Sequence, residues 1–169
     1  VLKEPSKPVG TVTPEVRELV SSMLESMYAA RGVGLAAEQV GRTECIAVID
    51  VPKDMEDADC VEPNAAVPMP LVLIDPEITE TKGALRRPEG CLSFPDLYVD
   101  ITRARTVTFR CTNLAGERVV HTAHGLLARA VQHEIDHLHG VLMVDRMSTA
   151  QRRANAGKLK RIRMASNEA

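Results

Sequence analysis

The stretch His124-Gly-Leu-Leu-Ala-Arg-Ala-Val-Gln-His-Glu-Ile-Asp-His-Leu138 decides the fold, because its hydrophobic residues recur at the spacing of an α-helix. One side of that helix carries its apolar positions, which are Leu127, Val131, Ile135 and Leu138. Gly140 follows where a C-cap glycine is expected. The pattern predicts a helix over about 124–138, buried on one side and able to carry polar chemistry on the other.

The same helix contains the pattern H-E-x-x-H. His133 and His137 are one helical turn apart and project together, as two imidazole ligands of one metal must. Glu134 lies beside them without having to bind the metal, and in metal-assisted hydrolysis such a carboxylate transfers protons. The alternative is an amphipathic helix whose histidines are only structural. The pattern favours a metal site, because it has a defined chemistry.

A catalytic metal site needs a third protein ligand, and the residues leave several candidates. The zinc-peptidase pattern continues with a glycine and a histidine; Gly140 fits, but Met143 occupies the histidine position. His139 is only two residues from His137, so it is expected to point away from the ligand side and to be a surface or capping residue.

Cys91 is a further candidate ligand. Gly90 and Pro95 bracket it and predict an irregular segment that could aim a thiolate at a metal. Taken alone, a single cysteine is more often a small buried hydrophobic residue. His121 and His124 are expected to be structural or to support the ligands. The residues by themselves therefore leave the third ligand open.

Composition limits the classes of protein. The 169 residues fit one domain, taken here as 1–169 with a basic C-terminal helix or tail at 148–169. A net charge of −2 gives no basic field for nucleic acid, and no apolar run is long enough for a membrane span. We expect a soluble protein that is not secreted and that binds neither DNA nor membrane. Widely spaced cysteines favour a reducing compartment: Cys45, Cys60, Cys91 and Cys111.

Periodic segments predict the elements around the central helix. Thr13 followed by Pro14 and Glu15 predicts a helix start, and an apolar stripe follows it. Strands are predicted over 45–51, 71–74, 105–112 and 117–121. The segment 148–164 permits a helix. Together they predict an α+β fold, with antiparallel sheets packed around the motif-bearing helix, an N-terminal helix and a C-terminal helix.

Three segments together resemble the peptide deformylases. These are Gly32-Val-Gly-Leu-Ala-Ala-Glu-Gln39, Glu89-Gly-Cys-Leu-Ser93 and His133-Glu-Ile-Asp-His137, in the order and at the spacing of that family. The resemblance spans roughly residues 1–147. It implies a metal-dependent hydrolase that removes the formyl group from N-formylmethionyl nascent peptides and releases formate.

The resemblance also implies the roles of individual residues. Cys91, His133 and His137 would bind the metal, and Glu134 would be the general acid and base. Gln39 and the Leu92 amide would hold the oxyanion, where one donor is commonly worth about a hundredfold in rate. The implied substrate-binding residues are Val33, Gly34, Glu89, Gly90, Leu126, Arg129 and Ala130.

The identity of the metal follows less directly. Thiolate and imidazole ligands accept zinc, iron(II), nickel or cobalt. The resemblance favours one iron(II) ion in the cell, a monomer, and a location in a bacterial-type cytoplasm or an organelle. The basic C-terminal helix has two interpretations: a solvated surface, or a contact with ribosomal RNA where the substrate emerges.

Several positions depart from the family pattern. Glu38 stands where proline is common and is expected to be an exposed loop carboxylate of little effect. Tyr98 replaces an arginine found near the substrate in some relatives. Arg129 is more polar than expected for a pocket, so its stem is expected to pack while its guanidinium reaches water. Asp136 is expected to pair with an arginine such as Arg103.

Two other functions compete with deformylation. A metallopeptidase that cuts internal peptide bonds would lack its expected third histidine. A zinc-stabilised binding module would not explain why Glu134 and Gln39 accompany three ligands, because closed structural sites use four.

Overall fold

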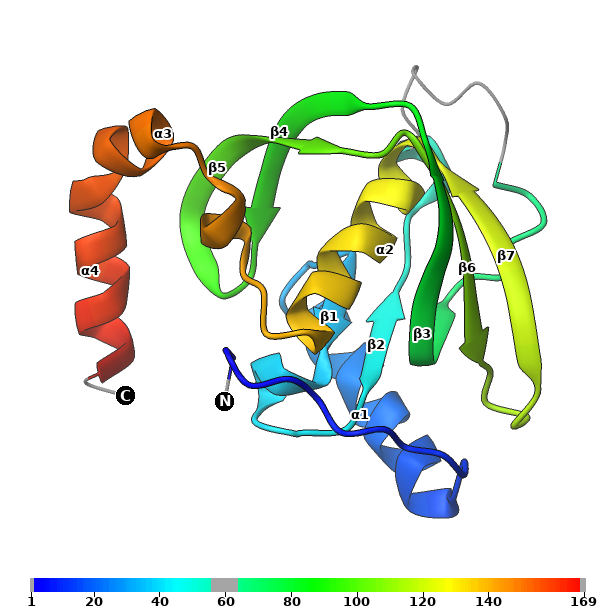
Figure 1. The fold of residues 1–169 in the computed structure, drawn as a ribbon. Helices are drawn as coiled ribbons and strands as arrows, with labels where there is room; N and C mark the ends of the chain where they lie inside the picture. The colour runs from blue at the N-terminus through cyan, green and yellow to red at the C-terminus, as the bar shows by residue number, and fades with distance from the viewer. Residues whose placement is uncertain (1, 56–63, 168–169) are drawn as a thin grey trace.

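The computed structural model describes residues 2–55 and 64–167, so Cys60 lies outside the described residues. Two antiparallel sheets form the framework (Figure 1). The larger sheet has the order β1-β2-β3-β6-β7, with β1 at Gly34–Ala36, β2 at Ile46–Ile49, β3 at Leu71–Lys82, β6 at Thr106–Thr112 and β7 at Arg118–His124. The smaller sheet is a hairpin of β4 (Leu85–Cys91) and β5 (Phe94–Arg103).

Four α-helices and three short 3-10 helices complete the described chain. The α-helices are α1 (Pro14–Ala29), α2 (Gly125–Leu138), α3 (Thr149–Ala154) and α4 (Ala156–Asn167). The 3-10 helices are η1 (Ala37–Val40), η2 (Lys53–Met55) and η3 (Met143–Arg146). Within the described part of the chain, no helix is both long and apolar enough to cross a membrane.

The motif-bearing helix α2 is buried in the centre of the fold, as predicted. It lies between the larger sheet and the β4–β5 hairpin (Figure 1). Its apolar side packs on the sheet around Phe109, and all four predicted core positions are buried: Leu127, Val131, Ile135 and Leu138. The predicted α+β fold class is confirmed. Gly140 has a positive φ of 72° just beyond the helix, as a glycine near a helix C-terminus often does.

Helices cover both faces of the larger sheet. Along β2, Ala47 and Ile49 pack toward α2, while Ile46 and Val48 pack toward α1. This alternation follows from the two-residue period of a strand, and it explains why every β2 residue is buried. The predicted N-cap of α1 is confirmed, because the Thr13 hydroxyl accepts from the Val16 N–H at 3.3 Å.

The prediction of an irregular segment around Cys91 is wrong. Cys91 ends strand β4, and β5 returns beside it in a hairpin. Prolines at 88 and 95 obscured the strands, although a two-stranded sheet has edges on both sides, where proline is tolerated. The buried alternation of Leu97, Val99 and Ile101 was the available signal for β5.

The C-terminal segment forms two helices, α3 and α4, instead of one continuous helix. The break is at Asn155, whose side-chain amide donates to the Gln151 carbonyl at 2.9 Å and so competes with the helical backbone. Leu159 and Ile162 of α4 pack against the apolar side of the β4–β5 hairpin. This attaches α4 to the same hairpin that carries Cys91.

Candidate metal centre and catalytic cavity

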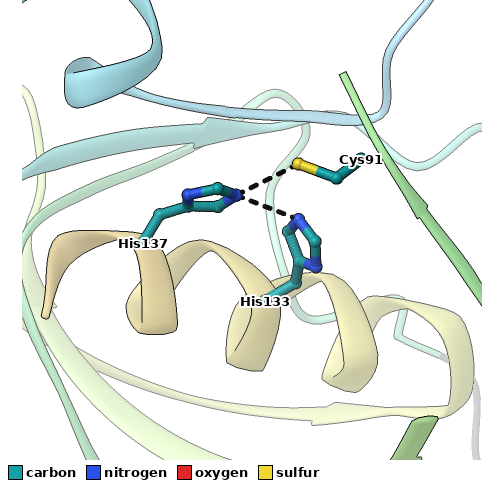
Figure 2. A group of neighbouring side chains, drawn as sticks. All are labelled: Cys91, His133 and His137. Carbon is teal, nitrogen blue, oxygen red and sulfur yellow. Dashed lines mark hydrogen bonds between the residues drawn. The ribbon is translucent and has the colours of Figure 1, made fainter. Parts of the chain in front are cut away.

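The three predicted ligands meet at one point. Helix α2 presents His133 and His137 with their Nε2 atoms 3.2 Å apart, and the end of β4 places Cys91 Sγ 3.2 Å from His137 Nε2 (Figure 2). All three donor atoms lie within 4.8 Å of one another. Among the described residues this is the one group of histidine, cysteine or carboxylate side chains that is arranged to hold a metal ion.

The other ligand candidates lie elsewhere. His139 is exposed at the C-cap of α2, and His124 occupies the N-cap position of that helix, with its ring near the Thr106 hydroxyl. His121 contacts the ring of Phe109. Met143, at the position where a zinc peptidase would carry its third histidine, is a buried core residue. Cys91 is therefore the third ligand candidate that the geometry supports.

The protonation of the two histidines fits a metal site. Burial lowers the pKa of His137 to about 3, so this imidazole is neutral and its nitrogen lone pair is free for a metal. Burial also opposes charge on His133, but hydrogen bonds to Cys91 and Glu89 raise its pKa to about 10. A divalent cation at His133 Nε2 can take the place of a proton there, while Nδ1 keeps its proton and its hydrogen bond to Glu89. A thiolate with two imidazoles is a donor set that zinc, iron(II), nickel and cobalt accept.

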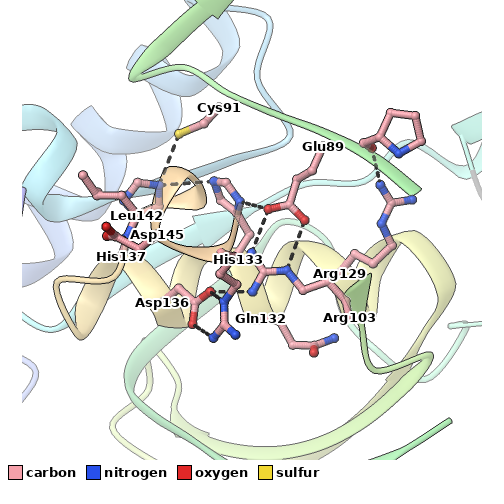
Figure 3. Close-up of polar contacts among 12 residues, drawn as sticks. Glu89, Cys91, Arg103, Arg129, Gln132, His133, Asp136, His137, Leu142 and Asp145 are labelled. Atoms are coloured by element: carbon pink, nitrogen blue, oxygen red, sulfur yellow. Dashed lines mark hydrogen bonds and ion pairs between the residues drawn. The ribbon is translucent and has the colours of Figure 1, made fainter. Parts of the chain in front are cut away.

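Charged side chains hold the His133 ring at Nδ1, the ring nitrogen that does not face Cys91 and His137 (Figure 3). Glu89 Oε1 accepts from His133 Nδ1 at 2.6 Å, and Arg103 donates to both Glu89 oxygens at 2.7 and 3.1 Å. Arg103 also donates to Asp136 at 2.5 Å, which confirms the predicted pairing. Such a carboxylate fixes the tautomer and direction of a ligand histidine. Glu89 was expected to contact substrate; it lines the cavity, and its carboxylate also orients His133.

Glu134 is a buried carboxyl group at the same place. Its Oε2 atom has no hydrogen-bond partner among the described residues. Burial raises its pKa to about 7, against an opposing effect of His133. Strand β1 passes so close that a Cβ built at Gly34 would lie 2.9 Å from the Glu134 Cδ atom, so any larger residue there would displace the carboxyl group. A carboxyl with this pKa can both accept and donate a proton near neutral pH.

Gln39 is oriented from both ends of its amide. Its Oε1 accepts from the Ala36 N–H at 2.9 Å, which turns Nε2 toward Ser93 Oγ at 2.9 Å and Cys91 Sγ at 3.7 Å. Leu92 lies in the turn of the β4–β5 hairpin with its side chain 40% exposed. Ser93 was assigned no separate role from the sequence, yet its hydroxyl is the nearer of the two acceptors of Gln39 Nε2.

A cavity of about 650 Å³ opens onto the centre. Every predicted site residue except His137 lines it: Val33, Gly34, Gln39, Glu89, Gly90, Cys91, Leu92, Leu126, Arg129, Ala130, His133 and Glu134. Tyr98 also lines it with 73% of its surface exposed, packed so near Gly90 that a Cβ there would lie 2.7 Å from the tyrosine ring. All the predicted site residues other than His137 therefore line the same cavity.

Two predictions about polar residues near this cavity are wrong. The Arg129 guanidinium does not reach water: the residue is 8% exposed and Nη2 donates to the Pro88 carbonyl at 2.7 Å. Glu38 is not an exposed loop carboxylate but is 3% exposed, and neither carboxylate oxygen has a hydrogen-bond partner among the described residues. Burial raises the pKa of Glu38 to about 7. Both errors concern contacts between segments far apart in the sequence.

Comparisons with known proteins agree on one family. The family profile described as "Polypeptide deformylase" matches residues 1–153. A peptide deformylase of Caulobacter vibrioides is 42% identical over 166 residues, covering 98% of this chain and 90% of that protein. One from Synechococcus sp. (strain CC9605) is 46% identical over 149 residues, covering 88% of this chain and 69% of that protein.

Solved structures give the same result. The crystal structure of peptide deformylase from Ehrlichia chaffeensis superposes with a TM-score of 0.85 at 31% identity, covering 99% of this chain and 92% of that chain. The Synechococcus elongatus peptide deformylase, solved in complex with actinonin, has a TM-score of 0.80 at 40% identity, covering 93% and 82% of the two chains.

Proposed function

The chain belongs to the peptide deformylase family, and from this premise we propose that Cys91, His133 and His137 hold one divalent metal in an enzyme that removes the formyl group from N-formylmethionyl peptides. The observation that carries the proposal is the convergence of one cysteine sulfur and two imidazoles beside the buried carboxyl of Glu134, whose pKa is raised to about 7. When bound, such a metal supplies a nucleophile from water near neutral pH and polarises a carbonyl group. Iron(II) is the metal proposed in the cell, with zinc, nickel or cobalt as alternatives.

The peptide is proposed to bind in an extended form along β1 and the end of β4. The backbone at Val33 and Gly34 would pair with the substrate backbone, since the missing side chain at Gly34 permits close approach. The methionine side chain would enter the part of the cavity between Leu126 and Ala130 on α2. Arg129 contributes its aliphatic stem to this wall while its guanidinium stays on the Pro88 carbonyl.

Two donors are proposed to hold the oxygen of the formyl group. Gln39 Nε2 is already turned toward Cys91, and the Leu92 N–H lies in the adjacent hairpin turn. Donors that are fixed before the reaction stabilise developing negative charge without reorganisation. The Ala36 N–H therefore contributes indirectly, because it fixes the Gln39 amide.

Glu134 is proposed to move the proton. Its carboxylate takes a proton from the attacking water and then donates it to the amine nitrogen as the bond between the formyl carbon and that nitrogen breaks. The products are formate and a free N-terminal amine. A pKa raised to about 7 suits both steps.

We further propose that the basic helix α4 contacts ribosomal RNA, where formylated peptides emerge from bacterial-type ribosomes in a cytoplasm or organelle. The support is its run of cations, Lys158, Lys160, Arg161 and Arg163, without an acidic residue between them. Binding of the full chain and of a chain ending at Ser148 to purified ribosomes tests this. Equal affinity of the two would contradict it.

The main test is formate release from N-formyl-Met-Ala-Ser by protein loaded anaerobically with iron(II). The wild type is expected to release formate, and Glu134→Gln, which keeps the shape but not the proton transfer, to be slower by about 10²–10⁴-fold. An internally quenched, unformylated peptide serves as the control substrate and should remain intact. Metal-loaded protein that cleaves only the quenched peptide would instead identify a metallopeptidase.

A further inference from the structure

Arg146 lies in η3, outside the cavity, yet it is the outermost member of a series of charged contacts that leads to a proposed metal ligand. Its Nε donates to Asp136 Oδ2 at 2.5 Å and its Nη2 to Asp136 Oδ1 at 2.6 Å. This two-point geometry fixes the plane of the carboxylate. The Arg146 side chain is 44% exposed, whereas that of Asp136 is 12% exposed.

The series of charged contacts continues from Asp136 to His133 without a gap (Figure 3). Arg103 donates to Asp136 through Nη1 and to both oxygens of Glu89 through Nε and Nη2. Glu89 Oε1 accepts from His133 Nδ1. Two guanidinium groups therefore alternate with two carboxylates between η3 and the ligand ring.

Arg146 supplies one of the two guanidinium groups that face Asp136. Glu89 and Asp136 carry two negative charges, and Arg103 supplies one positive charge with three of its nitrogens already engaged. Without Arg146, Asp136 would keep only Arg103, whose other two nitrogens already donate to Glu89. The remaining cation would then be drawn toward whichever carboxylate is less well satisfied.

His133 depends on this support more than His137 does. The His137 Nδ1 atom is buried without a hydrogen-bond partner among the described residues, so no hydrogen bond at that nitrogen orients the ring, and its polar neighbours are the other two proposed ligands. The ring of His133 is held by Glu89 and therefore follows any movement of Arg103.

We propose that Arg146 is a positioning residue: by fixing Asp136 it keeps Arg103 on Glu89, and thereby keeps His133 Nε2 aimed at the metal. The inference rests on the proposed function. It differs from a purely structural role, in which Arg146 would only attach η3 and the following helices to α2.

Cobalt(II) binding to the metal-free chain separates these roles, because cobalt's visible spectrum reports on its ligands. Arg146→Gln is expected to weaken cobalt affinity about tenfold, measured against a competing chelator, and to change the spectrum. In the cobalt enzyme kcat should fall while KM for N-formyl-Met-Ala-Ser stays unchanged. Arg152→Gln removes an exposed arginine of the same region, 4.0 Å from Asp145, and should leave cobalt affinity, the spectrum, kcat and KM at wild-type values.

Arg146→Lys covers the case in which the glutamine variant does not fold. It retains the charge but not the two-point geometry, so cobalt affinity and spectrum between those of the wild type and the glutamine variant support the inference. Wild-type affinity and spectrum in the folded variants, even with a lower melting temperature, would overturn it. Failure of the wild-type chain to bind cobalt or release formate would overturn the proposed function instead.

Discussion

Glu89 and Glu38 are both buried, but their surroundings give them opposite electrostatics. Glu89 is 8% exposed; burial would raise its pKa, but hydrogen bonds from His133 and Arg103 lower it to about 2. Glu38 is 3% exposed, and burial raises its pKa to about 7, with no ion pair to a cation among the described residues. Burial alone thus does not decide whether a carboxyl is charged; its partners do.

The two regions serve different parts of the enzyme. The β4–β5 hairpin and α2 keep Glu89 permanently charged, as the support of a ligand histidine requires. In η1, Glu38 precedes Gln39 and lies near Ser6, whose hydroxyl donates to the Leu138 carbonyl at 2.8 Å. The first region contributes to stability at neutral pH through pairing, whereas Glu38 is expected to cost stability there.

Arg103→Met has the largest expected effect, because it removes ion pairs that are almost completely buried. Glu89 and Asp136 would lose the cation between them, and removing one partner of a buried ionic group costs about 3–5 kcal/mol. Urea unfolding of metal-loaded protein measures this free energy. Arg86→Met, which removes an exposed arginine of β4 that lies 3.7 Å from Asp100, should cost under about 1 kcal/mol. A similar small cost for Arg103→Met would show that the pairing does not hold this region.

The pH dependence of stability in a Glu38→Gln variant tests the electrostatics of the unpaired carboxyl Glu38. A carboxyl whose folded-state pKa is raised to about 7 from 4.5 favours the folded state when protonated. The wild type should therefore lose stability as pH rises from about 4.5 to 7, and stay at the lower value above 7. At about 1.4 kcal/mol per pKa unit, the penalty that glutamine removes at pH 8 is up to about 3 kcal/mol.

The comparison of pH values serves as the control for Glu38→Gln, because the buried amide of glutamine costs the same free energy at each pH. Urea unfolding at pH 5 and pH 8 should show the variant gaining stability relative to the wild type at pH 8. An identical difference at both pH values would mean that Glu38 does not titrate in this range.

The sequence predicted what depends on local periodicity and missed what depends on distant contacts. The α2 helix and its pair of histidines follow from spacing within one segment, and so were predicted correctly. Cys91 was identified from the resemblance, while its place in a strand was hidden by neighbouring prolines. No pattern within η1 indicates that Glu38 is covered, because burial there depends on packing against other segments.

Arg129 shows the same limit at the cavity wall. Its position on α2 was predictable, but its acceptor is the Pro88 carbonyl of β4, 41 residues earlier in the chain. Side-chain direction on a helix can be inferred from sequence spacing. The partner that meets it comes from another element, whose position no local pattern contains.

The exposed pair of Arg110 and Glu77 separates the effect of pairing from the effect of burial. Arg110 Nε donates to Glu77 Oε2 at 2.9 Å, but both side chains are about half exposed. Water screens such a pair, so a double-mutant cycle of Arg110→Ala and Glu77→Ala should give a coupling energy of about 0.2–1 kcal/mol. The coupling should shrink further in 1 M salt. A value near that of Arg103→Met would mean that pairing alone, without burial, is enough to stabilise this fold.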